Sequence, residues 1–287
     1  MIITGDDTEE IDKLKHYLSI EFKMKDLGGL KYFLGIEVAR SQQGIFLSER
    51  KYVLDLLNET GMLGCKPADT PIVQNHNLEI LPYQVPTNKD RYQRLVGRLI
   101  YLSHTRPDIA YAVSVVSQFM HSPSEVHMEA VMRILQYLKS APGKGLMFSK
   151  HGHLEIEGFT DADWAGNRTD RRSTSAEYRS MVHGVCEMLW IRKLLKELGF
   201  VAKDAMKLYC DNQATIDIAN NPVQHDRTKH VEIDRHFINE KLESNVISVP
   251  HVKSEEQLAN ILTKAVSSHA FSDSLDKLGI GDIYAPT

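Results

Sequence analysis

The order of the elements predicted after residue 146 constrains the fold of this chain more than any other feature. Alternating apolar and polar residues over 154–160 predict a strand, a long helix is predicted over about 176–198, and 207–210 predicts a second strand. Further helices are predicted to begin at 212 and to cover about 231–243, 254–266 and 268–277, with a short strand at 246–249. Strands that alternate with helices are typical of a parallel sheet, so residues 146–287 are predicted to form an α/β domain.

The first 145 residues show a different pattern, which predicts a mainly helical α+β domain. Two strands are expected over 31–38 and 44–47, with one helix before them and one after. Residues 64–90 are rich in proline and lack sustained periodicity, which is typical of an extended connector. Helices are then predicted over about 90–104, 108–120 and 124–140. The chain of 287 residues is long enough for two domains, and we place their boundary near residue 145.

Composition limits the class of protein. Hydrophobic residues make up 42% of the chain and charged residues 25%, as in ordinary globular proteins. No apolar run reaches the roughly 18 residues of a membrane span, and the acidic N-terminal segment does not resemble a signal peptide. The three cysteines are far apart in the sequence, which argues against a disulfide framework and a structural zinc site. We therefore expect an intracellular protein, cytoplasmic or nuclear, without a membrane partner.

The net charge of −4 excludes the bulk electrostatics of a histone-like nucleic-acid binder, so any contact with nucleic acid must be local. One candidate patch comprises Arg168, Arg171 and Arg172, and a second comprises Lys139 and Lys144. Charge clusters of this size are more often part of a solvated loop surface. Both interpretations stay open from the sequence.

Three acidic residues are expected to converge at one edge of the second-half sheet. Asp161 and Asp211 each end a predicted strand, and Glu177 lies in the first turn of the helix between these strands. The carboxyl ends of parallel strands share one edge, where ligands bind. Clustered carboxylates repel one another unless a cation neutralises them, and oxygen ligands suit Mg²⁺ or Mn²⁺. Each acid could instead be a helix cap or a surface charge.

Two other polar patterns have competing interpretations. Gly5-Asp6-Asp7 has the composition of a polymerase metal motif, but an acidic helical pattern follows at once, so capping by Asp6 or Asp7 is favoured. The histidines His230 and His236 lie four residues from Asp234 and Glu232, respectively, which suits a shared helix face. A zinc site there would need a third ligand, so surface or capping roles are favoured.

Several motifs occur in an order that resembles copia-type retrotransposon Pol polyproteins, specifically the C-terminal part of the reverse transcriptase followed by ribonuclease H. The motifs of the second half are Gly158-Phe159-Thr160-Asp161-Ala162-Asp163-Trp164-Ala165-Gly166, Arg171-Arg172-Ser173-Thr174-Ser175, Ala176-Glu177-Tyr178-Arg179, Leu208-Tyr209-Cys210-Asp211-Asn212-Gln213, Thr228-Lys229-His230-Val231-Glu232-Ile233-Asp234, and Glu255-Glu256-Gln257-Leu258-Ala259-Asn260-Ile261-Leu262-Thr263-Lys264.

This resemblance implies a ribonuclease H-like α/β domain behind a remnant of the reverse-transcriptase palm and thumb. It makes Asp161, Glu177 and Asp211 the first three metal-binding carboxylates, with Asn260 at the position of the fourth acid. The implied cofactor is Mg²⁺ or Mn²⁺. The implied substrate is the RNA strand of an RNA–DNA hybrid, and no small-molecule substrate is expected.

The first half resembles the end of the polymerase domain. Met1-Ile2-Ile3-Thr4-Gly5 resembles the strand after the family's Tyr-Val-Asp-Asp turn, so the polymerase aspartates would lie just upstream. Residues 24–28 and 32–37 resemble the primer-facing hairpin, and 96–102 with 105–113 resemble the thumb. Polymerase activity is therefore not expected, because phosphoryl transfer needs the metal ligands. The missing polymerase part of Pol is a candidate partner.

One departure from the family pattern affects the fold. In the family a β-hairpin lies between the Arg-Arg-Ser-Thr-Ser loop and the Ala-Glu-Tyr helix, whereas here Ser175 is followed directly by Ala176. The second and third strands are therefore expected to be missing, which leaves an unpaired edge on the first strand. Two functions remain open. One is a metal-dependent endonuclease, and the other is a catalytically inactive retroelement remnant that acts at most as a nucleic-acid-binding or interaction module.

Overall fold

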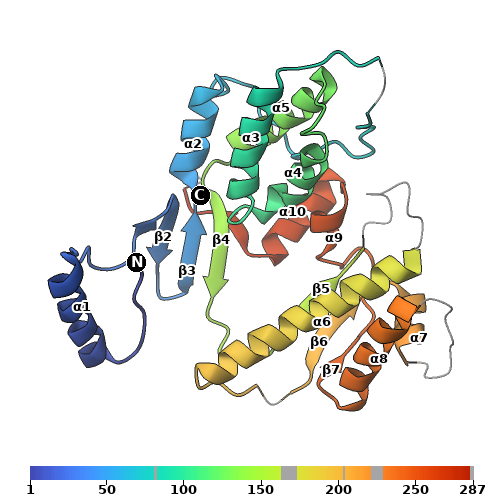
Figure 1. Ribbon diagram of the computed structural model, residues 1–287. Helices are drawn as coiled ribbons and strands as arrows, with labels where there is room; N and C mark the ends of the chain where they lie inside the picture. The colour runs from blue at the N-terminus through green and yellow to red at the C-terminus, as the bar shows by residue number, and fades with distance from the viewer. Residues whose placement is uncertain (81–82, 163–172, 203, 221–228, 285–287) are drawn as a thin grey trace.

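The computed structural model describes residues 1–80, 83–162, 173–202, 204–220 and 229–284, which form two separate sheets with helices packed on them (Figure 1). The first sheet is antiparallel and has the strand order β1-β2-β3-β4-β8. Its strands are β1 (Tyr32–Phe33), β2 (Ile36–Arg40), β3 (Gly44–Ser48), β4 (Lys144–Ser149) and β8 (Ile280–Asp282).

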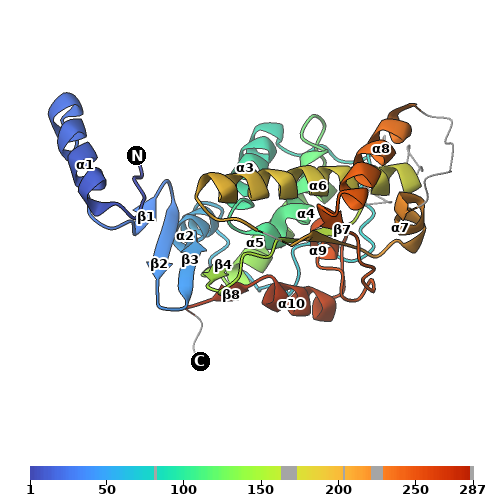
Figure 2. The same ribbon diagram turned by 90° about the horizontal axis from the view of Figure 1, so that it is seen from below.

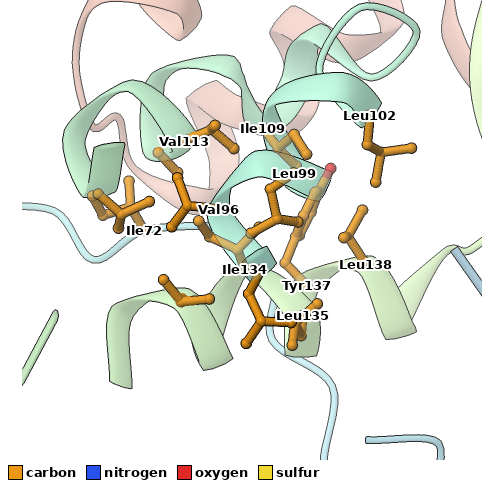
Figure 3. Close-up of a cluster of buried hydrophobic side chains, with 14 of the residues drawn as sticks. Ile72, Val96, Leu99, Leu102, Ile109, Val113, Ile134, Leu135, Tyr137 and Leu138 are labelled. Carbon is orange, nitrogen blue, oxygen red and sulfur yellow. The ribbon is translucent and has the colours of Figure 1, made fainter. Parts of the chain in front are cut away.

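A helical layer packs beside this sheet and encloses the larger hydrophobic core (Figure 3). Its elements are α2 (Arg50–Glu59), α3 (Lys89–Leu102), the 3₁₀ turn η1 (Pro107–Ile109), α4 (Ala110–Ser117) and α5 (Glu125–Ser140). In α3 the Asn88 side chain accepts a hydrogen bond from the Arg91 amide at 2.9 Å and so caps the helix. Val96 and Leu99 then recur at helical spacing and are fully buried, which explains why this segment is an amphipathic helix.

The end of the chain returns to this first core. Helix α10 (Ser268–Lys277) buries Phe271 and Leu275 against it, and β8 pairs with β4. Strand β4 crosses the boundary predicted near residue 145 and pairs with β3. The structural grouping therefore differs from a division into residues 1–145 and 146–287, because two segments of the second range belong to the first sheet and core.

The second sheet is parallel and has the order β5-β6-β7. Its strands are β5 (Glu157–Thr160), β6 (Met206–Cys210) and β7 (Ile247–Ser248), and its helices are α6 (Ser173–Glu197), α7 (Gln213–Asn220) and α8 (Lys229–Glu243). Helix α6 crosses the sheet diagonally (Figure 1). Gly158 allows this close approach, because a Cβ there would lie 3.0 Å from the Met188 sulfur. Within the described ranges this sheet contains no antiparallel strand, and β5 lies at its edge.

Helix α1 (Thr8–Phe22) projects from the body of the molecule, as Figures 1 and 2 show from two directions. Asp7 accepts hydrogen bonds from the amides of Glu9 and Glu10 at 3.1 and 3.0 Å, so the prediction of a helix cap at Asp6 or Asp7 is confirmed. None of its side chains is buried. In the parts of the chain that the structure describes, no helix combines the length and apolar character required to cross a bilayer.

Candidate active site

The three carboxylates predicted from the sequence come from three elements around one end of the parallel sheet. Asp161 follows the last residue of β5, and Asp211 follows the last residue of β6. Glu177 lies on α6, but the helix begins at Ser173, so Glu177 is one turn further into the helix than the sequence predicted. The parallel register of β5 and β6, with Thr160 opposite Cys210, brings the two aspartates to the same edge. The geometry thus follows from the strand–helix–strand order.

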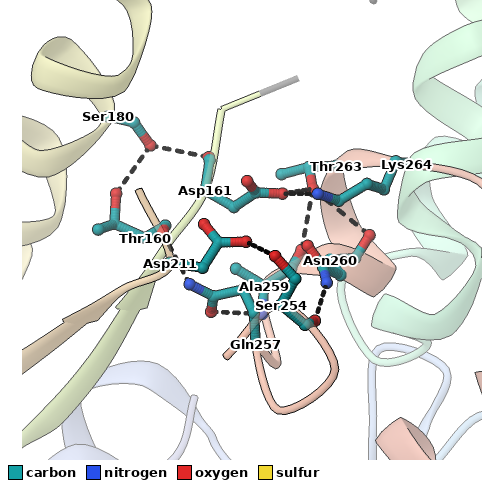
Figure 4. Close-up of polar contacts among 10 residues, drawn as sticks. All are labelled: Thr160, Asp161, Ser180, Asp211, Ser254, Gln257, Ala259, Asn260, Thr263 and Lys264. Atoms are coloured by element: carbon teal, nitrogen blue, oxygen red, sulfur yellow. Dashed lines mark hydrogen bonds and ion pairs between the residues drawn. The ribbon is translucent and has the colours of Figure 1, made fainter. Parts of the chain in front are cut away.

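Asp161 is a buried carboxylate with two polar partners (Figure 4). The hydroxyl of Thr263 donates a hydrogen bond to its Oδ2 atom, and Nζ of Lys264 lies 3.1 Å from the same oxygen. The backbone of Asp161 is also fixed, because Ser180 Oγ on α6 donates to its carbonyl at 2.9 Å. Asp161 therefore has little freedom to move.

Asp211 is held by the same part of the chain. Ser254 Oγ donates to its Oδ2 atom at 2.7 Å, and Asn260 Nδ2 donates to the Ser254 carbonyl at 2.7 Å (Figure 4). Gln257 connects this part of the chain to β5, since its Nε2 donates to the Thr160 carbonyl at 3.0 Å. We call residues 254–264, which include α9 (Asn260–Thr263), the closing segment.

The charges of both aspartates affect the pKa of Glu177. Burial raises the pKa of Glu177 to about 7, and the negative charges of Asp161 and Asp211 contribute to the increase. Lys264 and a hydrogen bond with Asn212 act in the opposite direction on this pKa. The Glu177 carboxyl is therefore within electrostatic reach of both aspartates, and we call these three groups the carboxylate cluster.

Two oxygens of this cluster are buried without a hydrogen-bond partner among the described residues: Oε2 of Glu177 and Oδ1 of Asn260. A buried polar atom without a partner is unfavourable, so an oxygen of this kind often indicates a missing ion or water. Both are hard oxygen donors of the type that Mg²⁺ and Mn²⁺ bind. The chemistry of the donor set therefore fits a divalent cation.

The side chains are not arranged as they would be around a bound metal ion. Within the described ranges, no three side chains of aspartate, glutamate, histidine or cysteine are arranged as ligands of one ion. In the same site, Oδ2 of Asp161 has Thr263 and Lys264 as partners, and Oδ2 of Asp211 has Ser254. The closing segment thus holds oxygens that a cation would need.

Other predicted residues lie elsewhere or outside the structure. The proposed arginine patch of Arg168, Arg171 and Arg172 lies outside the described residues. Lys144 is half-buried, and its ammonium lies 3.4 Å from the hydroxyl of Tyr137, so it contributes to the packing of β4 on α5. His236 is exposed.

Sequence reasoning missed the closing segment's contacts with the carboxylates. Thr263 and Lys264 lie three and four residues after Asn260, a spacing that would place all three on one helix face. The family pattern places a fourth acid at the position of Asn260, so this spacing could have indicated that Thr263 and Lys264 lie near the carboxylates. The hydroxyl of Ser254 had no comparable local signal.

Known proteins match nearly the whole length of the chain. Residues 1–74 match the family model described as reverse transcriptase (RNA-dependent DNA polymerase). The chain is 39% identical, over 98% of its length, to the retrovirus-related Pol polyprotein from transposon RE1 of Arabidopsis thaliana, and 33% identical over 98% to that from transposon TNT 1-94 of Nicotiana tabacum. It is 41% identical over 61% of its length to an uncharacterized mitochondrial protein of Arabidopsis thaliana, covering 72% of that protein. No solved structure matches.

The chain spans 21% and 24% of the length of these two Pol polyproteins, respectively. The two matches extend over 307 and 318 residues, whereas this chain has 287. The relatives therefore carry residues within the matched region that have no counterpart here.

Proposed function

Because the chain belongs to the copia-type retrotransposon Pol polyprotein family, we propose that its carboxylate cluster is a divalent-cation site for cutting the RNA strand of an RNA–DNA hybrid, as in ribonuclease H. The observation that carries this proposal is the parallel register of β5 and β6, which brings Asp161 and Asp211 to the same edge of the sheet, with Glu177 on the helix between these strands. The buried oxygens of Glu177 and Asn260, which have no hydrogen-bond partner in the part of the chain that the structure describes, support it further.

The roles of the residues follow from their chemistry. Asp161, Glu177 and Asp211 would hold Mg²⁺ or Mn²⁺, and Asn260 would contribute a neutral amide oxygen. A pair of such ions supplies an activated water and stabilises the leaving oxygen of a phosphodiester. An amide in place of a fourth carboxylate lowers the negative charge of the site, so we expect weaker metal binding than four acids would give.

Substrate recognition is expected to depend on the shape of the RNA–DNA hybrid and not on its base sequence. Ribonuclease H-type enzymes contact the minor groove and the 2′-hydroxyls of the hybrid and need few base contacts. In this proposal Arg168, Arg171 and Arg172, which lie between β5 and α6 in the sequence, contact phosphates of the hybrid.

The residues that the relatives carry in excess are proposed to lie between Ser175 and Ala176 and to form a hairpin next to β5. The edge position of β5 in the described sheet supports this placement. The sheet of a ribonuclease H fold would then be present here without its two antiparallel strands. We expect a less stable and slower nuclease than a complete domain would be.

The test is hybrid cleavage by the purified chain with Mg²⁺ or Mn²⁺. We expect cutting of the RNA strand of the hybrid with Mn²⁺, and loss of cutting in Asp161→Asn. The matched control is Asp55→Asn, which removes an exposed carboxylate from α2 in the first half and is expected to leave cleavage unchanged. Metal-independent cutting, or no cutting of any hybrid by the wild-type chain, would contradict the proposal.

A further inference from the structure

Lys264 carries a positive charge into the carboxylate cluster. It follows α9 directly, and its ammonium lies 3.1 Å from Oδ2 of Asp161. The Asp161 side chain is only 3% exposed, whereas that of Lys264 is 43% exposed. The lysine therefore reaches from the surface toward a carboxylate that water barely contacts.

The first half of the chain determines where Lys264 lies. Lys264 is one of the residues that line a small cavity, together with Thr70, Asp108 and Phe271, which belong to the first half and to α10. The following residues, Ala265 and Val266, pack against the first hydrophobic core, together with Ile261 of α9. The backbone around Lys264 is thus held by a different part of the molecule than the strands that carry the aspartates.

A divalent cation bound at Asp161 would lie close to this ammonium. Like charges at such a distance in a partly buried site repel strongly. In addition, Lys264 and Thr263 already occupy the Oδ2 oxygen. The same oxygen cannot have both an ammonium partner and a divalent ion without rearrangement.

We propose that Lys264 is the built-in counter-ion of the carboxylate cluster, and that a divalent cation binds only by displacing it from Asp161. This inference rests on the metal site proposed above. The exposed fraction of Lys264 provides a route for the displacement, since the ammonium can turn into solvent while Asp161 stays in place. Lys264 then sets the metal concentration at which the site fills.

The experiment measures Mn²⁺ binding by the full chain through the electron paramagnetic resonance of free Mn²⁺. Lys264→Met removes the charge and keeps a similar stem, and we expect it to bind Mn²⁺ at least about tenfold more tightly than the wild type. Lys264→Arg keeps the charge and is expected to stay within about twofold of the wild type. The matched control is Lys277→Met, which removes an exposed charge from α10 and is expected to change the affinity less than twofold.

A second readout uses no metal. In EDTA, Lys264→Met leaves the buried Asp161 carboxylate without its counter-charge, so the melting temperature is expected to fall. In the Asp161→Asn background the same change is expected to have little effect, because the charge it compensates is gone. Equal losses in both backgrounds would overturn the counter-ion role.

The two proposals can fail separately. If the wild type binds Mn²⁺ and Lys264→Met binds it equally or more weakly, the displacement by metal is refuted and the metal site stands. If no variant binds Mn²⁺, including Lys264→Met, the metal site is refuted and the displacement with it.

Discussion

Arg106 and Asp108 form an ion pair inside the core of the first half, where both side chains are fully buried. The guanidinium donates to the carboxylate through Nε and through its terminal nitrogen at 2.9 and 2.7 Å, and the hydroxyl of Tyr137 donates to the same carboxylate at 2.6 Å. Burial acts to raise the pKa of Asp108, but the charge of Arg106 and these hydrogen bonds outweigh it, so the pKa is lowered. Asp108 is therefore ionised, and its hydrogen bond with Tyr137 connects η1 to α5.

Replacing Asp108 with asparagine is expected to destabilise the chain by about 3–5 kcal/mol, since it leaves a buried guanidinium without a counter-charge. Tyr137→Phe removes only one hydrogen bond and is expected to destabilise by about 1–3 kcal/mol. Urea unfolding of both variants measures the two losses. A loss below about 1 kcal/mol for Asp108→Asn would show that the ion pair is not important for stability.

His127 is a buried residue whose protonation should affect stability. It stacks on Phe119 with ring centroids 3.9 Å apart, and its Nδ1 accepts a hydrogen bond from the Ser124 amide at 3.0 Å. Burial lowers its pKa below the ordinary value of 6.5. In the window between the lowered value and 6.5 the unfolded chain binds more protons than the folded chain, so stability falls as pH decreases through this window.

The check for His127 is the melting temperature between pH 5 and 8, compared with His127→Gln. Glutamine preserves the acceptor of the capping box but does not titrate. We expect the wild type to lose stability relative to the variant as pH falls below about 6.5, and to show a constant difference above about 7.5. Parallel profiles for the two proteins would refute the role of His127.

At the scale of residues, the sequence predicted those site residues whose position follows from the order of neighbouring strands and helices. Asp161 and Asp211 were found because each follows a strand, and Glu177 because it was predicted near the start of the intervening helix, which begins four residues before it. Thr263 and Lys264 were not assigned to the site, because they contact Asp161 across about a hundred residues of chain. The packing of α9 against the first core and the hydrogen bonds of Ser254 and Gln257 to the parallel sheet bring them there.

At the scale of elements, predictability again follows sequence separation. The hairpin of β2 and β3, with Ser41-Gln42-Gln43 at its turn, and the long helix α6 were readable from short-range patterns. Strands β4 and β8 were not predicted. They are defined by long-range pairing, since β4 pairs with β3 from about a hundred residues away and β8 pairs with β4 from more than a hundred residues away.

Gly145 shows how closely β3 and β4 approach. A Cβ at this position would lie 2.1 Å from the carbonyl oxygen of Leu47, which is backbone and cannot move aside. We expect Gly145→Ala to force the two strands apart and to destabilise the chain by about 1–3 kcal/mol. Gly64→Ala is the matched control, because nothing lies within 4 Å of the added atom. Equal midpoints of urea unfolding for the two variants would contradict this interpretation.

At the scale of the whole molecule, the path of the chain joins its two parts. The chain forms the first sheet and helical layer, then the parallel sheet, and then returns through α9 and α10 to complete the first core. The candidate site lies on this return path, because the closing segment contacts both aspartates just before the chain rejoins the first core. The stability of the first half and the geometry of the site are therefore coupled.

Phe271 is the residue in which this coupling can be measured. It is 5% exposed, and its ring packs edge-on against that of Tyr137 with centroids 5.5 Å apart. Phe271→Ala is expected to destabilise the chain by about 3–5 kcal/mol through the cavity that it leaves. Phe200→Ala, at a position that is 50% exposed, is the control and is expected to change stability by less than about 1 kcal/mol.

Hydrogen exchange then identifies the elements that lose stability in Phe271→Ala. If α10 is part of the first core, Phe271→Ala should increase amide exchange in α3, α4 and α5 as well as in α10, because these helices share one hydrophobic cluster. Exchange in β6 and α7, whose buried residues form a separate cluster, should change less. Faster exchange confined to residues 268–284 would mean that the returning segment is an appendage of the first core, and the link between that core and the carboxylate site would then be lost.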